Sequence, residues 1–228
     1  MDKKVLIIGG IVLAVVLLIV ATCISPKEEK VKEDLLGINY KIKGNETSLK
    51  YDTENLVVAM HIEDYGSVVM ELYPDVAPNT VNNFISLVKS GFYDNNSFHR
   101  LVPGFVLQGG DPDGKGSGGP GYTINGEFTS NGFENNLSHT KWVVSMARSS
   151  DPDSAGSQFF ICIDDATNLD GDYAAFGKVI DGFKNIEKIV DNENVADEQS
   201  GKLSRNLVIK KAVIDLKNKE YNDVVKNN

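Results

Sequence analysis

The sequence predicts a mainly β protein built on an antiparallel barrel. Three observations favour this class: many short runs of apolar and β-branched residues, two segments with helical periodicity, and no regular alternation of strand and helix. A chain of 228 residues can bury a sizeable core, and its 21 glycines suit the many turns that short strands require. We see no internal repeat.

The elements follow one another from residue 56. Extended or alternating apolar runs predict strands at residues 56–62, 66–73, 98–102, 105–108, 142–146, 159–163, 175–179 and 207–216. Asn79 or Thr80 can cap a helix that runs to about Lys89, where Gly91 ends it. The core face of this helix is predicted by its apolar spacing at Val81, Phe84, Ile85 and Val88. A second helix is predicted at residues 183–190.

The N-terminus has the pattern of a membrane segment. Lys3 and Lys4 precede an apolar run at residues 5–24, about as long as a bilayer core is thick. Lysines before the run and the charged KEEKVKED after it favour a cytoplasmic N-terminus and an exported domain. We therefore predict four parts: a signal anchor at 1–25, a polar spacer at 26–54, a barrel domain at 55–216, and a polar tail at 217–228 that frays.

A lipoprotein signal is the alternative for residues 1–25. The segment Val20-Ala21-Thr22-Cys23 loosely resembles a lipobox, although threonine is unusual directly before the cysteine. Both alternatives place the domain on the extracytoplasmic side of the cytoplasmic membrane, held there by one membrane pass or by lipid.

Residues 98–111, FHRLVPGFVLQGGD, carry the chemistry. Alternation places Phe98, Arg100 and Val102 on one face of a strand and His99 and Leu101 on the other. A turn at Pro103-Gly104 then leads into a second strand that ends in Gln108. An arginine among apolar neighbours either extends to water or is held at a site that uses its fixed fork of donors.

Three further blocks decide between these alternatives. They read GKGSGGPGY from Gly114, SMARSSDPDSAGSQFFICI from Ser145 and LDGDYAAFGKV from Leu169. In their order and spacing, the four blocks resemble the cyclophilins, a family of peptidyl-prolyl cis-trans isomerases, and the resemblance extends over residues 56–216. It implies an eight-stranded antiparallel barrel capped by a helix at each end.

The resemblance also assigns site residues. Arg100 would donate a hydrogen bond to the prolyl nitrogen, and Gln108 would orient Arg100 and the substrate. The residues expected to line the proline pocket are Phe105, Val106, Phe160, Leu169 and Tyr173. The backbone of Ala147, Arg148 and Ser149 would pair with an extended substrate, and Gln158 and Gly116 would border the adjoining groove.

Four positions depart from the family pattern. Val106 replaces a common methionine and keeps an apolar wall, and Arg148 stands where some members carry asparagine. Tyr173 stands where many members have histidine but still offers a ring and a hydroxyl. Asn168 stands where drug-sensitive members have tryptophan, so the resemblance does not imply tight cyclosporin binding.

Other conspicuous residues are expected to be structural. We assign Phe98, Phe159 and Cys162 to the core, and His99 to a hydrogen-bonded structural role. The segment from Asp111 to Gly116 hints at a calcium loop, but Lys115 and Tyr122 occupy ligand positions, and the three histidines lack zinc-site spacing. We therefore expect no metal and no cofactor.

The predicted function is isomerisation of X-Pro bonds in exported proteins, which assists their folding. A net charge of −9 argues against nucleic acid, and we expect a monomer whose partners are proline-containing polypeptides and, through residues 5–24, the membrane. The alternative is a proline-binding module that turns its ligand over slowly. Retention of Arg100, Phe105, Gln108 and Phe160 favours the enzyme. A general holdase would need a large exposed apolar surface.

Overall fold

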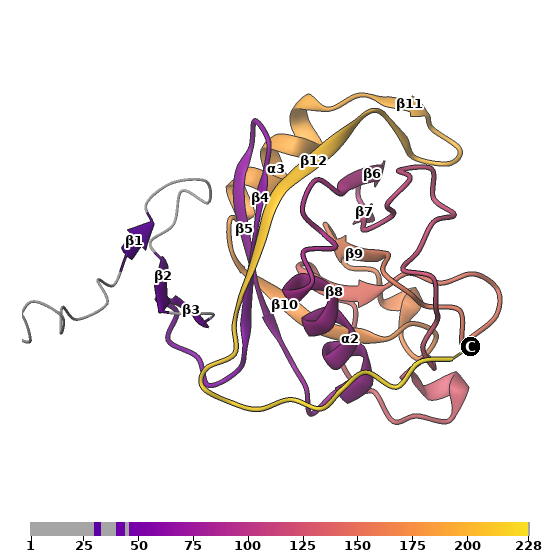
Figure 1. Cartoon of the computed structure of the whole chain (residues 1–228). Coiled ribbons are helices and arrows are strands. Elements are labelled where there is room, and N and C mark those ends of the chain that lie inside the picture. Colours follow the sequence, from indigo (N-terminus) through magenta and orange to yellow (C-terminus); the bar gives the residue numbers. More distant parts are fainter. Residues whose placement is uncertain (1–29, 33–39, 44–45, 228) are drawn as a thin grey trace, which may run out of the picture. The chain divides into compact units, whose positions relative to one another are not determined.

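The structure is a computed structural model that describes residues 30–32, 40–43 and 46–227 (Figure 1). The predicted anchor at residues 1–25 and much of the predicted spacer lie outside these residues. Within the described part of the chain, no helix has the length and apolar character needed to cross a membrane. A short sheet precedes the main domain, in the order β1 (Lys30–Lys32), β2 (Tyr40–Lys43), β3 (Glu46–Leu49).

The main domain is the predicted eight-stranded antiparallel barrel. Its strands are β4 (Val57–Ile62), β5 (Gly66–Leu72), β6 (Ser97–Val102), β7 (Val106–Gly109), β8 (Val143–Met146), β9 (Phe159–Cys162), β10 (Ala175–Asp181) and β12 (Lys202–Asp215). They follow one another around the barrel as β12-β4-β5-β10-β8-β9-β7-β6, and pairing of β6 with β12 closes it. The short β11 (Val195–Asp197) adds to β12. Closure leaves no free edge where the site is built.

Two α-helices accompany the barrel, α2 (Pro78–Lys89) and α3 (Phe183–Asn192), with short 3₁₀ turns η1 (Thr129–Asn131) and η2 (Thr167–Leu169). The predicted cap of α2 is wrong, because Ala77 is the N-cap residue and Pro78 opens the helix. The carboxylate of Glu127 instead accepts hydrogen bonds from the backbone N–H groups of Asn79 (2.9 Å) and Thr80 (2.7 Å). A remote anion thus satisfies the helix start.

The core is centred on an aromatic group inside the barrel. Phe159 is fully buried, and its ring meets those of Phe84, Tyr93 and Phe98 edge to face at centroid distances of 5.3, 5.6 and 5.6 Å. Phe98, Phe159 and Cys162 are buried, as the sequence predicts. Phe84 comes from α2, so this group also fixes the helix to the barrel.

A β-bulge in β6 overturns the predicted alternation of residues 98–102. The pairing of β6 with β7 shifts between Phe98, opposite Gly109, and Arg100, opposite Gln108. As a result Phe98 and Leu101 both belong to the main core, while Val102 packs with a separate cluster. Phe98 and Arg100 therefore do not share an apolar face. The bulge turns Arg100 away from the core, which is a common use of bulges near sites.

Residues 46–54 differ from the polar spacer that the sequence predicts. Leu49 is buried in a small cluster with Val57, Val69 and Val213 on the outside of the barrel wall. Its backbone N–H donates to Asp215 Oδ2 at 2.9 Å. The two apolar residues Leu49 and Tyr51 fall within a charged stretch, so composition alone hid this contact.

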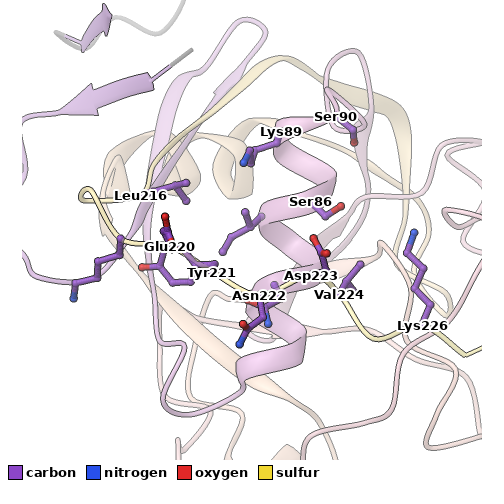
Figure 2. A pocket seen from close by; sticks show the side chains of 13 residues that line it. Ser86, Lys89, Ser90, Leu216, Glu220, Tyr221, Asn222, Asp223, Val224 and Lys226 are labelled. Carbon is purple, nitrogen blue, oxygen red and sulfur yellow. The ribbon is translucent and has the colours of Figure 1, made fainter. Parts of the chain in front are cut away.

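The C-terminal tail is not frayed. Val225 exchanges two hydrogen bonds with the Asn79 side chain, at 2.8 and 2.9 Å, and the Asn227 N–H donates to Thr123 O at 2.7 Å. Between the tail and the outer face of α2 lies a groove of about 920 Å³ (Figure 2). The groove contains none of the predicted site residues.

Candidate active site

A chain of side-chain hydrogen bonds runs from β6 through β7 to Gln158, the residue directly before β9. Arg100 Nη1 donates to Gln108 Oε1 at 3.2 Å, and Gln108 Nε2 donates to Gln158 Oε1 at 3.0 Å. Gln158 Nε2 donates in turn to Gly118 O at 2.9 Å. The sequence predicted all three side chains, and the structure brings them together. Each amide orients the next group, so the guanidinium has a fixed direction.

The guanidinium has a second hydrogen-bond acceptor, which the sequence analysis did not predict. Arg100 Nε donates to the backbone oxygen of Ser200 at 2.8 Å. Ser200 lies in the turn between β11 and β12, where Asp197 accepts hydrogen bonds from the Ser200 hydroxyl (2.7 Å) and the Gln199 N–H (3.0 Å). These hydrogen bonds lower the pKa of Asp197, and the bond from the Ser200 hydroxyl has the largest effect. Every residue has a backbone carbonyl, so the sequence could not identify this acceptor. The Asp-x-x-Ser-Gly pattern does indicate the turn that carries it.

Arg100 is half-buried and remains charged. Burial lowers the pKa of its guanidinium from the ordinary value of 12.5, and the nearby Tyr173 opposes that shift. Arginine stays protonated in proteins at any physiological pH. Arg100 is therefore a fixed cation whose free N–H groups can donate hydrogen bonds to a bound ligand.

An apolar cluster lies next to Arg100. Val106 and Phe160 are buried in it, and the half-buried Phe105, Ala147, Leu169 and Tyr173 pack against it. The ring of Phe160 meets that of Tyr173 edge to face at 5.8 Å. All five residues predicted to line the pocket thus belong to one cluster, and half of its members are open to solvent on one side.

The Gly-rich loop is organised by one buried carboxylate. Asp111 accepts hydrogen bonds from the backbone N–H groups of Asp113 (2.8 Å), Lys115 (3.0 Å) and Gly116. Burial alone would raise the pKa of Asp111, but these backbone donors lower it. Gly116 is exposed with φ +93°, and the bond to Asp111 fixes its backbone. Gly118, which the sequence analysis did not single out, contacts Gln158.

The segment from Ala147 to Ser149 leaves main-chain groups free beside the cluster. Ala147 N–H donates to Gln158 O at 2.9 Å, and Ser149 N–H donates to Ser154 Oγ at 2.9 Å. Between them, the backbone N–H and C=O of Arg148 have no partner in the described part of the chain. An extended peptide can pair with such groups.

A Ser-His-Asp arrangement lies behind the cluster. His139 Nδ1 is 2.8 Å from Asp170 Oδ1, and His139 Nε2 is 3.0 Å from Ser145 Oγ. Ser145 and His139 are 0% and 1% exposed, so no substrate can reach the hydroxyl and a hydrolase role is excluded. The ring of His139 stacks on Phe160 at 6.1 Å. The arrangement thus fixes the segment around Asp170, which carries Leu169 and Tyr173.

His99 corrects a prediction. We expected a hydrogen-bonded structural histidine, yet neither ring nitrogen has a partner among the described residues, although the side chain is buried. Burial lowers the pKa of His99. The negative charge of Asp111 opposes this shift, and the positive charge of Arg100 adds to it. The bulge in β6 falls at His99, and Nε2 lies close to the Gly-rich loop, 3.9 Å from the place that a Cβ on Gly116 would take.

The buried histidines predict a dependence of stability on pH. Burial lowers the pKa of His99 and of His139, for which Asp170 partly opposes the shift. Each folded-state pKa thus lies below the unfolded value of about 6.5, so the unfolded chain binds more protons as the pH falls. We expect the free energy of unfolding to decrease from pH 7.5 to pH 5.5, by at most about 1.4 kcal/mol per pH unit for each histidine.

Urea unfolding at several pH values in this window measures the effect, because most carboxylates do not titrate there. His99→Leu should flatten the dependence. A stability that is constant from pH 7.5 to pH 5.5, or a slope that His99→Leu leaves unchanged, would contradict the assignment.

Comparison with known proteins agrees with this geometry. The family described as cyclophilin type peptidyl-prolyl cis-trans isomerase/CLD matches residues 57–214. The chain is 44% identical over 137 residues to peptidyl-prolyl cis-trans isomerase B of Bacillus subtilis, covering 60% of this chain and 92% of the relative. It is 42% identical over 126 residues to an isomerase of Helicobacter pylori, covering 54% and 74%.

A solved structure shows the same fold. The cyclophilin type peptidyl-prolyl cis-trans isomerase of Cryptosporidium parvum, crystallised in the presence of the dipeptide Ala-Pro, superposes with a TM-score of 0.61 at 35% sequence identity. The match covers 69% of this chain and 98% of the other.

Proposed function

Because the chain belongs to the cyclophilin-type peptidyl-prolyl cis-trans isomerase family and is such an isomerase, we propose that Arg100 supplies the hydrogen bond that lowers the barrier to X-Pro rotation. In this mechanism the apolar cluster around Phe160 receives the proline ring. The backbone of Ala147, Arg148 and Ser149 holds the flanking residues in an extended form. No covalent intermediate is formed.

The chemistry asks for few groups. Resonance between the amide nitrogen and the carbonyl sets a barrier of about 18–20 kcal/mol to rotation about the peptide bond. As the bond twists, the nitrogen lone pair becomes localised and able to accept a hydrogen bond. A donor that is already in place there binds the twisted amide better than the planar one, which is the condition for catalysis.

One observation carries the proposal: Arg100 is fixed by two hydrogen bonds, to Gln108 Oε1 and Ser200 O, and still keeps donors free. Arginine has five N–H donors, and these contacts use two. Because these hydrogen bonds are formed before the substrate binds, the guanidinium needs little reorganisation during the reaction.

The test of this function is exchange of a short Ala-Pro peptide between cis and trans, followed by NMR with the full chain purified in mild detergent. The detergent alone serves as the blank. We expect acceleration of an exchange that otherwise takes tens to hundreds of seconds. If the folded chain binds the peptide without accelerating it, the protein is a proline-binding module and the proposed mechanism fails.

We also propose that residues 5–24 hold the enzyme at the extracytoplasmic side of the cytoplasmic membrane, where its substrates are exported proteins in the course of folding. The lysines before the apolar run and the charged residues after it support this orientation. Protease added outside spheroplasts or protoplasts should degrade the domain and spare a cytoplasmic protein. For a signal anchor, Cys23→Ser should change the mass only by the substitution itself and leave the membrane fraction unchanged, whereas loss of a lipid mass would favour the lipoprotein alternative.

A further inference from the structure

The side chain of Arg148 has a contact set that the isomerase mechanism does not use. Its guanidinium carbon is 4.7 Å from the ring centroid of Tyr173 and 5.1 Å from that of Phe128. Nε donates to Asp172 O at 2.9 Å, and Nη1 donates to Ser149 O at 2.8 Å. Two rings and two carbonyls therefore fix a half-buried cation in one orientation.

This cation has no anionic partner. Among the ion pairs of the described residues none includes Arg148, whereas Arg205 pairs with Glu193 and Asp64. The contrast matters in a chain with 32 acidic and 23 basic residues, where a free arginine is easily paired. Arg148 uses two of its five N–H donors on carbonyls, and the donors of Nη2 have no partner in the described part of the chain.

The position of the cation relates it to the substrate. Tyr173 packs on the apolar cluster that receives the proline, and Arg148 covers that ring. The main-chain groups of Arg148 are free to pair with the peptide that leads out of the cluster. A side chain next to the proline on a peptide paired in this way would therefore lie beside the guanidinium.

We propose that Arg148 is a specificity-determining residue that selects an acidic side chain immediately before the proline. This inference rests on the proposed function and names the substrate class for the same site. A planar guanidinium with free donors binds a carboxylate through parallel, charge-assisted hydrogen bonds. Because its fixed orientation precedes binding, little side-chain entropy is lost when the carboxylate arrives.

The experiment compares kcat/KM of the full chain for three peptides that differ only before the proline: Glu-Pro, Gln-Pro and Lys-Pro. We expect Glu-Pro to be preferred over Gln-Pro by about fivefold at low salt, as for one partly exposed charge pair. The preference should fall toward one as salt rises to about 1 M, where the screening length is about 3 Å.

The variants isolate the charge. In Arg148→Gln the ratio of Glu-Pro to Gln-Pro should fall to about one, and in Arg148→Glu the order should reverse in favour of Lys-Pro. A purely structural role, such as support of the Tyr173 ring, would change kcat/KM for all three peptides by the same factor and leave the ratio intact. Arg205→Gln removes a distant arginine of the same charge and should keep the ratio of the parent.

Each outcome decides between the hypotheses. Equal rates for Glu-Pro and Gln-Pro in the parent, or a ratio that survives Arg148→Gln, would overturn the charge selection while leaving the isomerase intact. A parent that accelerates none of the three peptides would overturn the proposed mechanism and this inference together.

Discussion

Arg100→Ala is expected to lower kcat/KM for an X-Pro peptide by about 100-fold, or roughly 2.7 kcal/mol of barrier. The reason is that the variant removes the donor to the prolyl nitrogen, an interaction that exists only as the amide twists. Gln108 and Ser200, which position Arg100 in the parent, stay in place but cannot donate a hydrogen bond to the prolyl nitrogen. The loss should therefore appear in kcat, with a smaller change in KM.

Arg100→Lys separates charge from geometry. Lysine keeps the positive charge but lacks the planar fork that reaches Gln108 Oε1 and Ser200 O together. We expect activity between those of the parent and Arg100→Ala. Both variants should unfold at urea concentrations close to that of the parent, since Arg100 is half-buried and outside the main core.

Arg205→Ala is the matched control. Arg205 is exposed and binds Glu193 and Asp64, away from the hydrogen-bond chain of the site. Its loss should leave kcat/KM within about twofold of the parent. If Arg100→Ala behaves like Arg205→Ala, the barrier is lowered by some other group, and the mechanism proposed for this site is wrong.

Much of the barrel follows from local pattern. All eight barrel strands overlap predicted runs, and both helices lie where periodicity placed them, although α3 runs on to Asn192. Arg100, Gln108 and Gln158 could be identified because a family resemblance links them across 58 positions of sequence (158 − 100). A buried side chain in a regular strand is constrained by its own neighbours, which is why such features can be read locally.

The misses share a physical cause, since each depends on a partner remote in sequence. The bulge at His99 is set by the register of β6 on β7 and β12. Glu127 caps a helix that begins 49 residues earlier (127 − 78), and Asn79 fixes a tail that composition alone predicts to fray. Ser200 contributes a carbonyl, which every residue has. The two rings around Arg148 come together only in the folded chain.

Phe159→Ala should mainly lower stability and Phe160→Ala should mainly lower kcat/KM, although the two residues are adjacent in β9. Phe159 faces the main core and touches Phe84, Tyr93 and Phe98, while Phe160 faces the cluster that carries Tyr173. We expect Phe159→Ala to lower the free energy of unfolding by about 3–5 kcal/mol through the cavity it leaves. Its remaining folded fraction should turn over peptide at nearly the parental rate.

Phe160→Ala should instead lower kcat/KM by about 10-fold or more, mainly through KM, because it removes apolar surface that binds the proline ring in ground state and transition state alike. Its stability should fall less than that of Phe159→Ala, since the half-buried Phe105, Leu169 and Tyr173 leave one side of the cluster open. Urea unfolding and peptide exchange on the same samples measure both quantities.

Phe159→Leu keeps this comparison usable if Phe159→Ala does not fold, because leucine fills most of the space and is expected to remove about 1–1.5 kcal/mol. The two outcomes bear on one question, which is whether the alternation of a strand can separate folding from binding. In β9 successive side chains point to opposite faces, so one residue serves the core and the next serves the substrate. If Phe160→Ala retained parental kcat/KM, the proline would bind outside this cluster, and the roles proposed for Leu169 and Tyr173 would fall with that of Phe160.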